Sequence, residues 1–194
     1  MSQRGDRPAS SACHAPAPRY LHRVPDSPQR DPTESRGLLF DQFDLGRTFT
    51  SRARSITQAD IDGFARLSGD LNPLHTDEQF AAGTVFRSRI AHGLLIQSVA
   101  SGLAWELGIF DRTIAALTEM LIAFQNPAIP GDTVRLELTV AEKDPAPSSR
   151  RGWIRFVARV LNQRDEVVIQ GSWTTLMHRK ADRHRELTRE ATRG

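Results

Sequence analysis

The stretch from Gly93 to Leu107 restricts the fold more than any other part of this sequence. Its only polar side chains are Gln97, Ser98, Ser101 and Glu106. A helix that is apolar on nearly every side is buried on nearly every side, so we expect a central core helix, with Trp105 buried in it and Gly108 closing it. The run is too short and too interrupted for a membrane span, which needs roughly 20 apolar residues.

Four runs with strand character follow this stretch. The clearest is 134–140, in which apolar and polar residues alternate with a period of two. The other three runs are 114–126, 153–161 and 167–177. Consecutive strands joined by short turns favour antiparallel pairing. One buried helix followed by four strands predicts an α+β fold in which an antiparallel sheet wraps around the helix.

The 194 residues are enough for one domain with a sizeable core. We expect that domain to span 38–179, between a disordered N-terminal tail (1–37) and a charged C-terminal tail (180–194). The net charge of +3 belongs to the tails, because each carries +2 whereas 38–179 is near −1. A nucleic-acid-binding protein would be expected to carry a basic stripe on its folded face, and the sequence shows none.

Cysteine usage and the N-terminus bear on the compartment. The single cysteine, Cys13, allows neither a disulfide framework nor a thiolate metal cluster. No segment pairs a basic start with an apolar signal core. We therefore expect a cytoplasmic protein that spans no membrane, and we assign it no metal and no cofactor.

A helix is expected just before the most informative motif. Thr57-Gln58-Ala59-Asp60 resembles a capping box, and Gly69 suits the position just past the helix end. The apolar residues between them recur at helical spacing: Ile61, Phe64, Ala65 and Leu67. This helix should deliver the chain into Asp70 with a buried stripe beneath it.

The motif itself, 69–77, reads Gly-Asp-Leu-Asn-Pro-Leu-His-Thr-Asp. Asn72-Pro73 should interrupt the helix, so we expect Asp70 and His75 to lie on non-helical backbone and to converge on a cleft. A carboxylate and an imidazole placed in this way are a candidate acid/base pair. Asn72 would brace the loop through backbone hydrogen bonds, and Asp77 would cap the next helix.

Ile90-Ala91-His92-Gly93 leads into the apolar helix. The first N–H groups of a helix lack intrahelical partners, so those near His92 and Gly93 could donate to a polarised oxygen. His92 fits a buried, hydrogen-bonded position as well as a site-lining one. Ser98 fits a plain core hydroxyl, although contact with substrate is favoured. The combination suggests adding or removing water next to a carbonyl.

These motifs, with Phe124, Pro127 and Gly131-Asp132-Thr133-Val134 downstream, resemble the MaoC-like (R)-specific enoyl-CoA hydratase/dehydratase family over about 38–177. The resemblance implies a hot-dog fold, usually a homodimer with one continuous sheet and sometimes a heterodimer. It implies that Asp70 and His75 are catalytic and that Ser98 lines the site, where we also assign Asn72, His92 and Gly93 to substrate binding.

One position departs from the family pattern. Members often carry proline just before the Ile of the Ile-x-His-Gly segment, whereas this chain has Arg89. Two interpretations are open: Arg89 reshapes the loop over the site, or it places a cation near the phosphate of an acyl carrier.

The resemblance implies an acyl-CoA or acyl-carrier-protein thioester as substrate, with Asp70 and His75 activating one water while backbone N–H groups polarise the thioester carbonyl. The alternatives are a 3-hydroxyacyl-carrier-protein dehydratase, a hot-dog thioesterase, and a non-catalytic acyl-binding partner subunit. Metal-dependent hydrolysis is a further alternative, with four candidate ligands: Asp70, His75, Asp77 and His92.

Overall fold

The computed structural model describes residues 37–180. The expected tails, including Cys13, lie outside the described residues except for Gly37 and Lys180. Within 37–180, no helix is long and apolar enough to cross a membrane. The elements are η1 (Phe40–Gln42), β1 (Thr48–Thr50), β2 (Arg54–Ser55), α1 (Gln58–Ser68), α2 (Pro73–Thr76), α3 (Glu78–Ala82), α4 (Gly93–Glu106), β3 (Ile114–Phe124), β4 (Thr133–Lys143), β5 (Arg151–Asn162) and β6 (Val167–His178).

The strands form one antiparallel sheet in the order β1-β4-β5-β6-β3, with β2 also pairing with β4. The four predicted strand runs are confirmed as β3 to β6. Their expected pairing in chain order is wrong at one step, because β3 pairs with β6 rather than with β4. The chain therefore places β3 at the edge of the sheet, where one side of the strand has no neighbour within the described chain.

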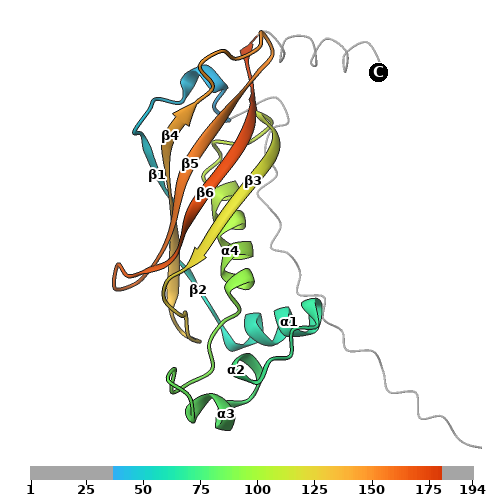
Figure 1. The fold of residues 1–194 in the computed structure, drawn as a ribbon, viewed down its shortest axis with the longest axis vertical. Helices are drawn as coiled ribbons and strands as arrows, with labels where there is room; N and C mark the ends of the chain where they lie inside the picture. Colours follow the sequence, from blue (N-terminus) through green and yellow to red (C-terminus); the bar gives the residue numbers. More distant parts are fainter. Residues whose placement is uncertain (1–36, 181–194) are drawn as a thin grey trace, which may run out of the picture. The chain divides into compact units, whose positions relative to one another are not determined.

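Helix α4 packs along the sheet, and α1, α2 and α3 gather at one end of it (Figure 1). The alternating pattern of β4 directs one set of side chains into the core with α4. This set is Val134, Leu136, Leu138 and Val140. Each fully buried side chain of this size is worth roughly 1.5–3 kcal/mol. The arrangement confirms the predicted α+β, hot-dog architecture.

The expectation that α4 is buried on nearly every side is wrong for one face. Leu95, Ile96, Val99 and Leu103 are buried, but the side chains of Leu94 and Trp105 are 59% and 55% exposed. An apolar sequence predicts that a helix is covered but not by which element or which chain. Within the described residues of the single chain, no element covers the face that carries Leu94 and Trp105. Leu67 of α1 is likewise exposed rather than part of a buried stripe.

Candidate active site

The end of α1 places Asp70 in the site. Thr57 and Asp60 form the predicted capping box, and Gly69 ends the helix with a φ of 77°. A left-handed conformation costs glycine little, so the chain can reverse here without strain. The Asp70 N–H donates to Ser68 Oγ at 3.2 Å, and Asp70 Oδ1 accepts from the Asn72 N–H at 3.3 Å. These contacts fix the aspartate while its side chain stays accessible.

His75 lies in the short helix α2, so its predicted non-helical backbone is wrong. Proline interrupts a helix interior but is favoured in the first turn, and Pro73 begins α2 in that way. Asn72 caps the helix by accepting a hydrogen bond from the Leu74 N–H at 3.0 Å. The predicted bracing role of Asn72 is confirmed, and it takes the form of a helix cap.

Each histidine of the site contacts a backbone carbonyl of the segment that carries the other histidine. His75 Nδ1 lies 2.9 Å from the Ile90 carbonyl oxygen, and His92 Nε2 lies 3.0 Å from the Asp70 carbonyl oxygen. A carbonyl only accepts, so in the neutral imidazoles the proton belongs on His75 Nδ1 and on His92 Nε2. His75 Nε2 is then the nitrogen with a free lone pair, which a general base requires.

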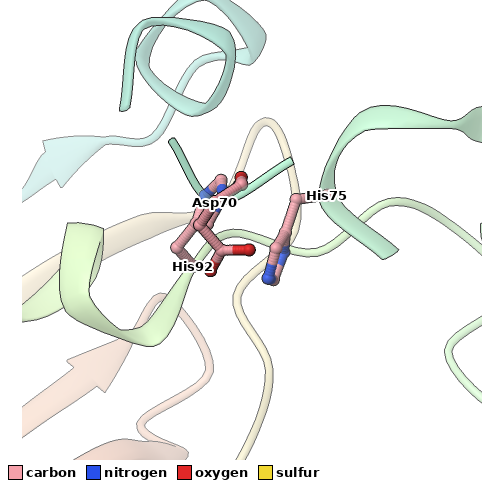
Figure 2. A group of neighbouring side chains, drawn as sticks. All are labelled: Asp70, His75 and His92. Carbon is pink, nitrogen blue, oxygen red and sulfur yellow. The ribbon is translucent and has the colours of Figure 1, made fainter. Parts of the chain in front are cut away.

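The side chains of Asp70, His75 and His92 converge, and the Asp70 carboxylate points toward the His75 imidazole (Figure 2). One donor atom from each of the three lies within 4.8 Å of the others. His92 is almost completely buried, and its Nδ1 has no hydrogen-bond partner among the described atoms. The cluster has donors suited to a metal ion as well as to acid/base chemistry. Asp77, the fourth candidate ligand, instead caps α3 by accepting from the Phe80 N–H.

Asp70, His75 and His92 line a cavity of about 410 Å³. Its remaining walls come from α1, the segment 86–91, the start of α4, the end of β3 with the following residues 125–128, and the start of β6. The main apolar wall residues are Phe64, Phe86, Ile90, Leu94, Phe124, Val168 and Ile169. A cavity with an apolar wall and a few converging polar groups is typical of a small-molecule site. The acid/base candidates therefore face a space suited to an apolar chain.

The start of α4 forms one side of this cavity. His92 is the N-cap residue, and its side chain makes no capping hydrogen bond. The N–H groups of the first turn are therefore not satisfied by a cap, and they lie beside the cavity at Gly93. A β-carbon at Gly93 would approach Phe124 Cδ1 to 2.7 Å, so only glycine lets this ring lie against the helix start.

Two of the assigned residues lie away from the cavity in the single chain. Ser98 is exposed on α4 and donates to the Leu94 carbonyl at 2.8 Å, and it is not among the residues that line the cavity. Asn72 also lies outside the cavity lining. Its visible role is to support the backbone that carries Asp70 and His75.

The sequence did not reveal the aromatic wall or the support behind His75. Phe64 was expected only in the buried stripe of α1 and Phe124 only as a family landmark, although Phe64 lies at helical spacing from Ser68, which also lines the cavity. Arg89 Nε donates to the His75 carbonyl at 2.7 Å, and its Nη2 pairs with the Asp62 carboxylate. Arg89 stood out in the sequence because the family often has proline at this position. Its partners, His75 and Asp62, are 14 and 27 residues away, so the sequence did not identify them.

The family comparison identifies a matching domain. Residues 42–152 match the model of the MaoC like domain. A protein named 3-hydroxybutyryl-CoA dehydratase, from Methylorubrum extorquens, is 35% identical over 139 residues, which cover 71% of this chain and 83% of that protein. A protein named (R)-specific enoyl-CoA hydratase, from Rhodospirillum rubrum, is 34% identical over 139 residues, which cover 71% of this chain and 90% of that protein.

Solved structures give the same answer for the fold. The crystal structure of a MaoC-like dehydratase from Rhodospirillum rubrum superimposes with a TM-score of 0.65 at 26% sequence identity. The match covers 74% of this chain and 99% of that one. The cavity, the cluster of Asp70, His75 and His92, and the start of α4 all lie within residues 42–152, apart from the β6 wall.

Proposed function

The chain belongs to the MaoC-like dehydratase family, whose named relatives are hydratases and dehydratases, and we propose that it adds water to 2-enoyl thioesters and removes it from (R)-3-hydroxyacyl thioesters. One observation carries this proposal. A carboxylate and an imidazole with a free Nε2 converge on an apolar cavity beside a helix start without a side-chain cap.

Each part of the site matches a requirement of the reaction. In hydration, the water oxygen bonds to the β-carbon, a base takes one water proton, and the α-carbon gains a proton as the alkene π bond is consumed. Asp70 and His75 holding one water between them supply the base and the acid. Either group, well positioned, is worth about 10²–10⁴-fold in rate.

The thioester oxygen becomes negative as the enolate forms. The N–H groups at the start of α4 near Gly93 point their positive dipole ends at this charge, and the helix dipole adds to the effect. A donor of this kind typically contributes about 10²–10³-fold in rate. The acyl chain would extend along the apolar wall that Phe64, Phe124 and Ile169 help to form.

We also propose that the protein works as a dimer of identical subunits joined along β3. Leu117, Leu121 and Phe124 of this edge strand are 44%, 60% and 57% exposed, and Leu94 and Trp105 expose the neighbouring face of α4. An exposed apolar edge strand is a ready template for pairing with another chain. Pairing would continue the sheet across two subunits, and a heterodimer with a related chain would use the same edge.

A second candidate function is metal-dependent hydrolysis. The observation in its favour is that one possible ligand atom from each of Asp70, His75 and His92 lies within 4.8 Å of the others, and that one nitrogen of each imidazole contacts a backbone carbonyl. Histidine ligands of metals commonly have such a second contact. We favour hydration because the cavity continues away from the cluster along an apolar wall.

The experiment that tests the proposal is a substrate panel with chiral product analysis. Purified full-length protein is incubated with 2-enoyl-CoA thioesters of increasing length and with matched carrier-protein thioesters. We expect loss of the enoyl absorbance and formation of the (R)-3-hydroxyacyl product. Release of free thiol from a saturated acyl-CoA would identify a thioesterase instead, and no turnover of any thioester would favour a non-catalytic partner subunit.

A further inference from the structure

Arg89 connects three segments around the catalytic histidine. Its Nε donates to the His75 carbonyl at 2.7 Å, and its Nη2 pairs with Asp62 Oδ1 of α1. The side chain of Arg89 is only 14% exposed. Both contacts come from one planar guanidinium, so α1 and α2 are held at a fixed separation.

The residue after Arg89 completes the arrangement. The Ile90 carbonyl accepts from His75 Nδ1 at 2.9 Å, and the Ile90 N–H donates to the Leu74 carbonyl at 3.1 Å. His75 is therefore held at its backbone by the Arg89 guanidinium and at its ring by the adjacent backbone carbonyl. A shift of residues 89–90 would change both contacts at once.

Asp62 is itself held in place for this role. Its Oδ1 also accepts from Gln58 Nε2 at 2.9 Å. Partial burial acts to raise the pKa of Asp62, but the hydrogen bonds from Arg89 and Gln58 and the positive charges of Arg89 and Arg66 outweigh it. The pKa of this carboxyl is therefore lowered, and the charged pair with Arg89 persists at neutral pH.

We propose that Arg89 is a positioning residue: by tying the His75 carbonyl to Asp62, it holds the His75 imidazole with Nδ1 on the Ile90 carbonyl and Nε2 toward Asp70. The role in turnover rests on the hydration chemistry proposed above, whereas the effect on the imidazole does not. Arg89 contacts the backbone carbonyl of His75 rather than a reacting side-chain atom, and its guanidinium already binds that carbonyl and the Asp62 carboxylate. We therefore assign it a supporting role rather than phosphate binding.

The first test is steady-state hydration of crotonyl-CoA by Arg89→Gln. A catalytic group displaced by about 1 Å can cost about 10²-fold in rate, so we expect kcat to fall by about 10- to 100-fold while KM stays within about twofold. Arg89→Lys should remain impaired, because an ammonium cannot reproduce both contacts of the planar fork. A raised KM with normal kcat, restored by lysine, would overturn the proposal in favour of phosphate binding.

Two comparisons separate positioning from loss of charge or of fold. Arg87 is exposed and lies two residues before Arg89. Arg87→Gln removes its positive charge and should leave kcat and KM unchanged. Asp62→Asn should also lower kcat. The double variant should be no worse than Arg89→Gln, because both single changes break the same contact between Arg89 and Asp62. Additive losses in the double variant would contradict the shared role.

The second test needs no substrate, so it remains decisive even if the protein is not a hydratase. Histidine ¹⁵N shifts, recorded near pH 8.5 and assigned to His75 with His75→Gln, report which ring nitrogen carries the proton. We expect the Nδ1–H form in the unmodified protein and a mixture of tautomers in Arg89→Gln and Arg89→Lys. If Arg89→Gln and Arg89→Lys are folded and keep the tautomer of the unmodified protein, the positioning role is wrong, whatever the activity of the unmodified protein.

Discussion

The imidazole rings of His75 and His92 stack in a tilted arrangement, with their centroids 3.8 Å apart and their planes inclined by 31°. The stack joins two segments that are distant in sequence. Each ring also contacts a carbonyl of the other segment: His75 contacts Ile90, and His92 contacts Asp70. The geometry of the Asp70–His75 pair therefore depends on His92, although His92 need not take part in proton transfer.

The first prediction concerns the proposed acid/base pair. Asp70→Asn and His75→Ala should each reduce crotonyl-CoA hydration by about 10²–10⁴-fold, because each removes a group that we propose transfers a proton. The melting temperature should change little in Asp70→Asn, because Asp70 is exposed, and fall modestly in His75→Ala, because the partly buried ring also contacts the Ile90 carbonyl and the His92 ring. Asp77→Asn is the matched control: it alters a helix cap within the same motif, so activity should stay within about twofold. Near-normal turnover by either Asp70→Asn or His75→Ala would refute the pair.

The second prediction concerns the buried histidine. His92→Phe keeps an aromatic ring but loses the donor to the Asp70 carbonyl, so we expect about 1–3 kcal/mol of destabilisation and a fall in kcat of about tenfold or more. His92→Gln can present a donor near the position of Nε2 and should retain more of both. Chemical denaturation and steady-state kinetics measure the two effects. If the two variants behave alike, the contact with the Asp70 carbonyl does not orient the site.

The third prediction concerns the approach of Phe124 to α4. In Gly93→Ala the new methyl group would meet the Phe124 ring, so the ring must move into the cavity or away from the helix start. We expect a higher KM for longer enoyl-CoA substrates and little change in melting temperature. Adding Phe124→Leu to Gly93→Ala should recover part of the loss. No recovery would show that the backbone of α4, rather than the ring, had shifted.

Local sequence signals predicted much of this fold. The capping box at Thr57, the glycine at position 69 and the strand period of β4 each depend on near neighbours, and each is confirmed. The pairing of β3 with β6 was missed because chain order does not specify which strand closes a sheet. The exposure of Trp105 was missed for a related reason: apolar composition predicts burial without saying whether the cover comes from the same chain.

The candidate site divides in the same way. The spacing in residues 69–77 brought forward Asp70 and His75, and the structure places both on one cavity. The contacts of His75 with the Ile90 carbonyl and of His92 with the Asp70 carbonyl join residues that are distant in sequence, as does the pair of Arg89 and Asp62. The separations are 15 to 27 positions. Such pairs depend on tertiary packing, so no local pattern in a single sequence could specify them.

The fourth prediction concerns metal dependence. If one water is activated by Asp70 and His75, hydration of crotonyl-CoA should survive exhaustive chelation and dialysis without loss of rate. If instead a metal bridges Asp70, His75 and His92, activity should disappear and return on adding Zn²⁺ or Mn²⁺. Elemental analysis of the purified protein accompanies the assay. Restoration by a metal, with hydrolysis of a thioester as the restored reaction, would replace the hydratase proposal.

The fifth prediction concerns the exposed edge of the sheet. Leu121→Arg places a charge in the middle of β3, where pairing with a second subunit would have to desolvate it, so we expect the molecular mass from light scattering to fall from dimer to monomer. Val157→Arg is the matched control, because Val157 is also partly exposed but lies on the interior strand β5. It should leave the dimer intact.

The same pair of variants tests whether assembly matters for the site. Leu94 and Phe124 are both exposed and both line the cavity, so a second subunit seated on β3 and α4 would cover part of its opening. A monomeric Leu121→Arg should therefore bind long acyl chains more weakly than short ones, relative to Val157→Arg. A fully active monomer with unchanged chain-length preference would show that each chain carries a complete site. In that case the apolar edge of β3 would have to serve another purpose.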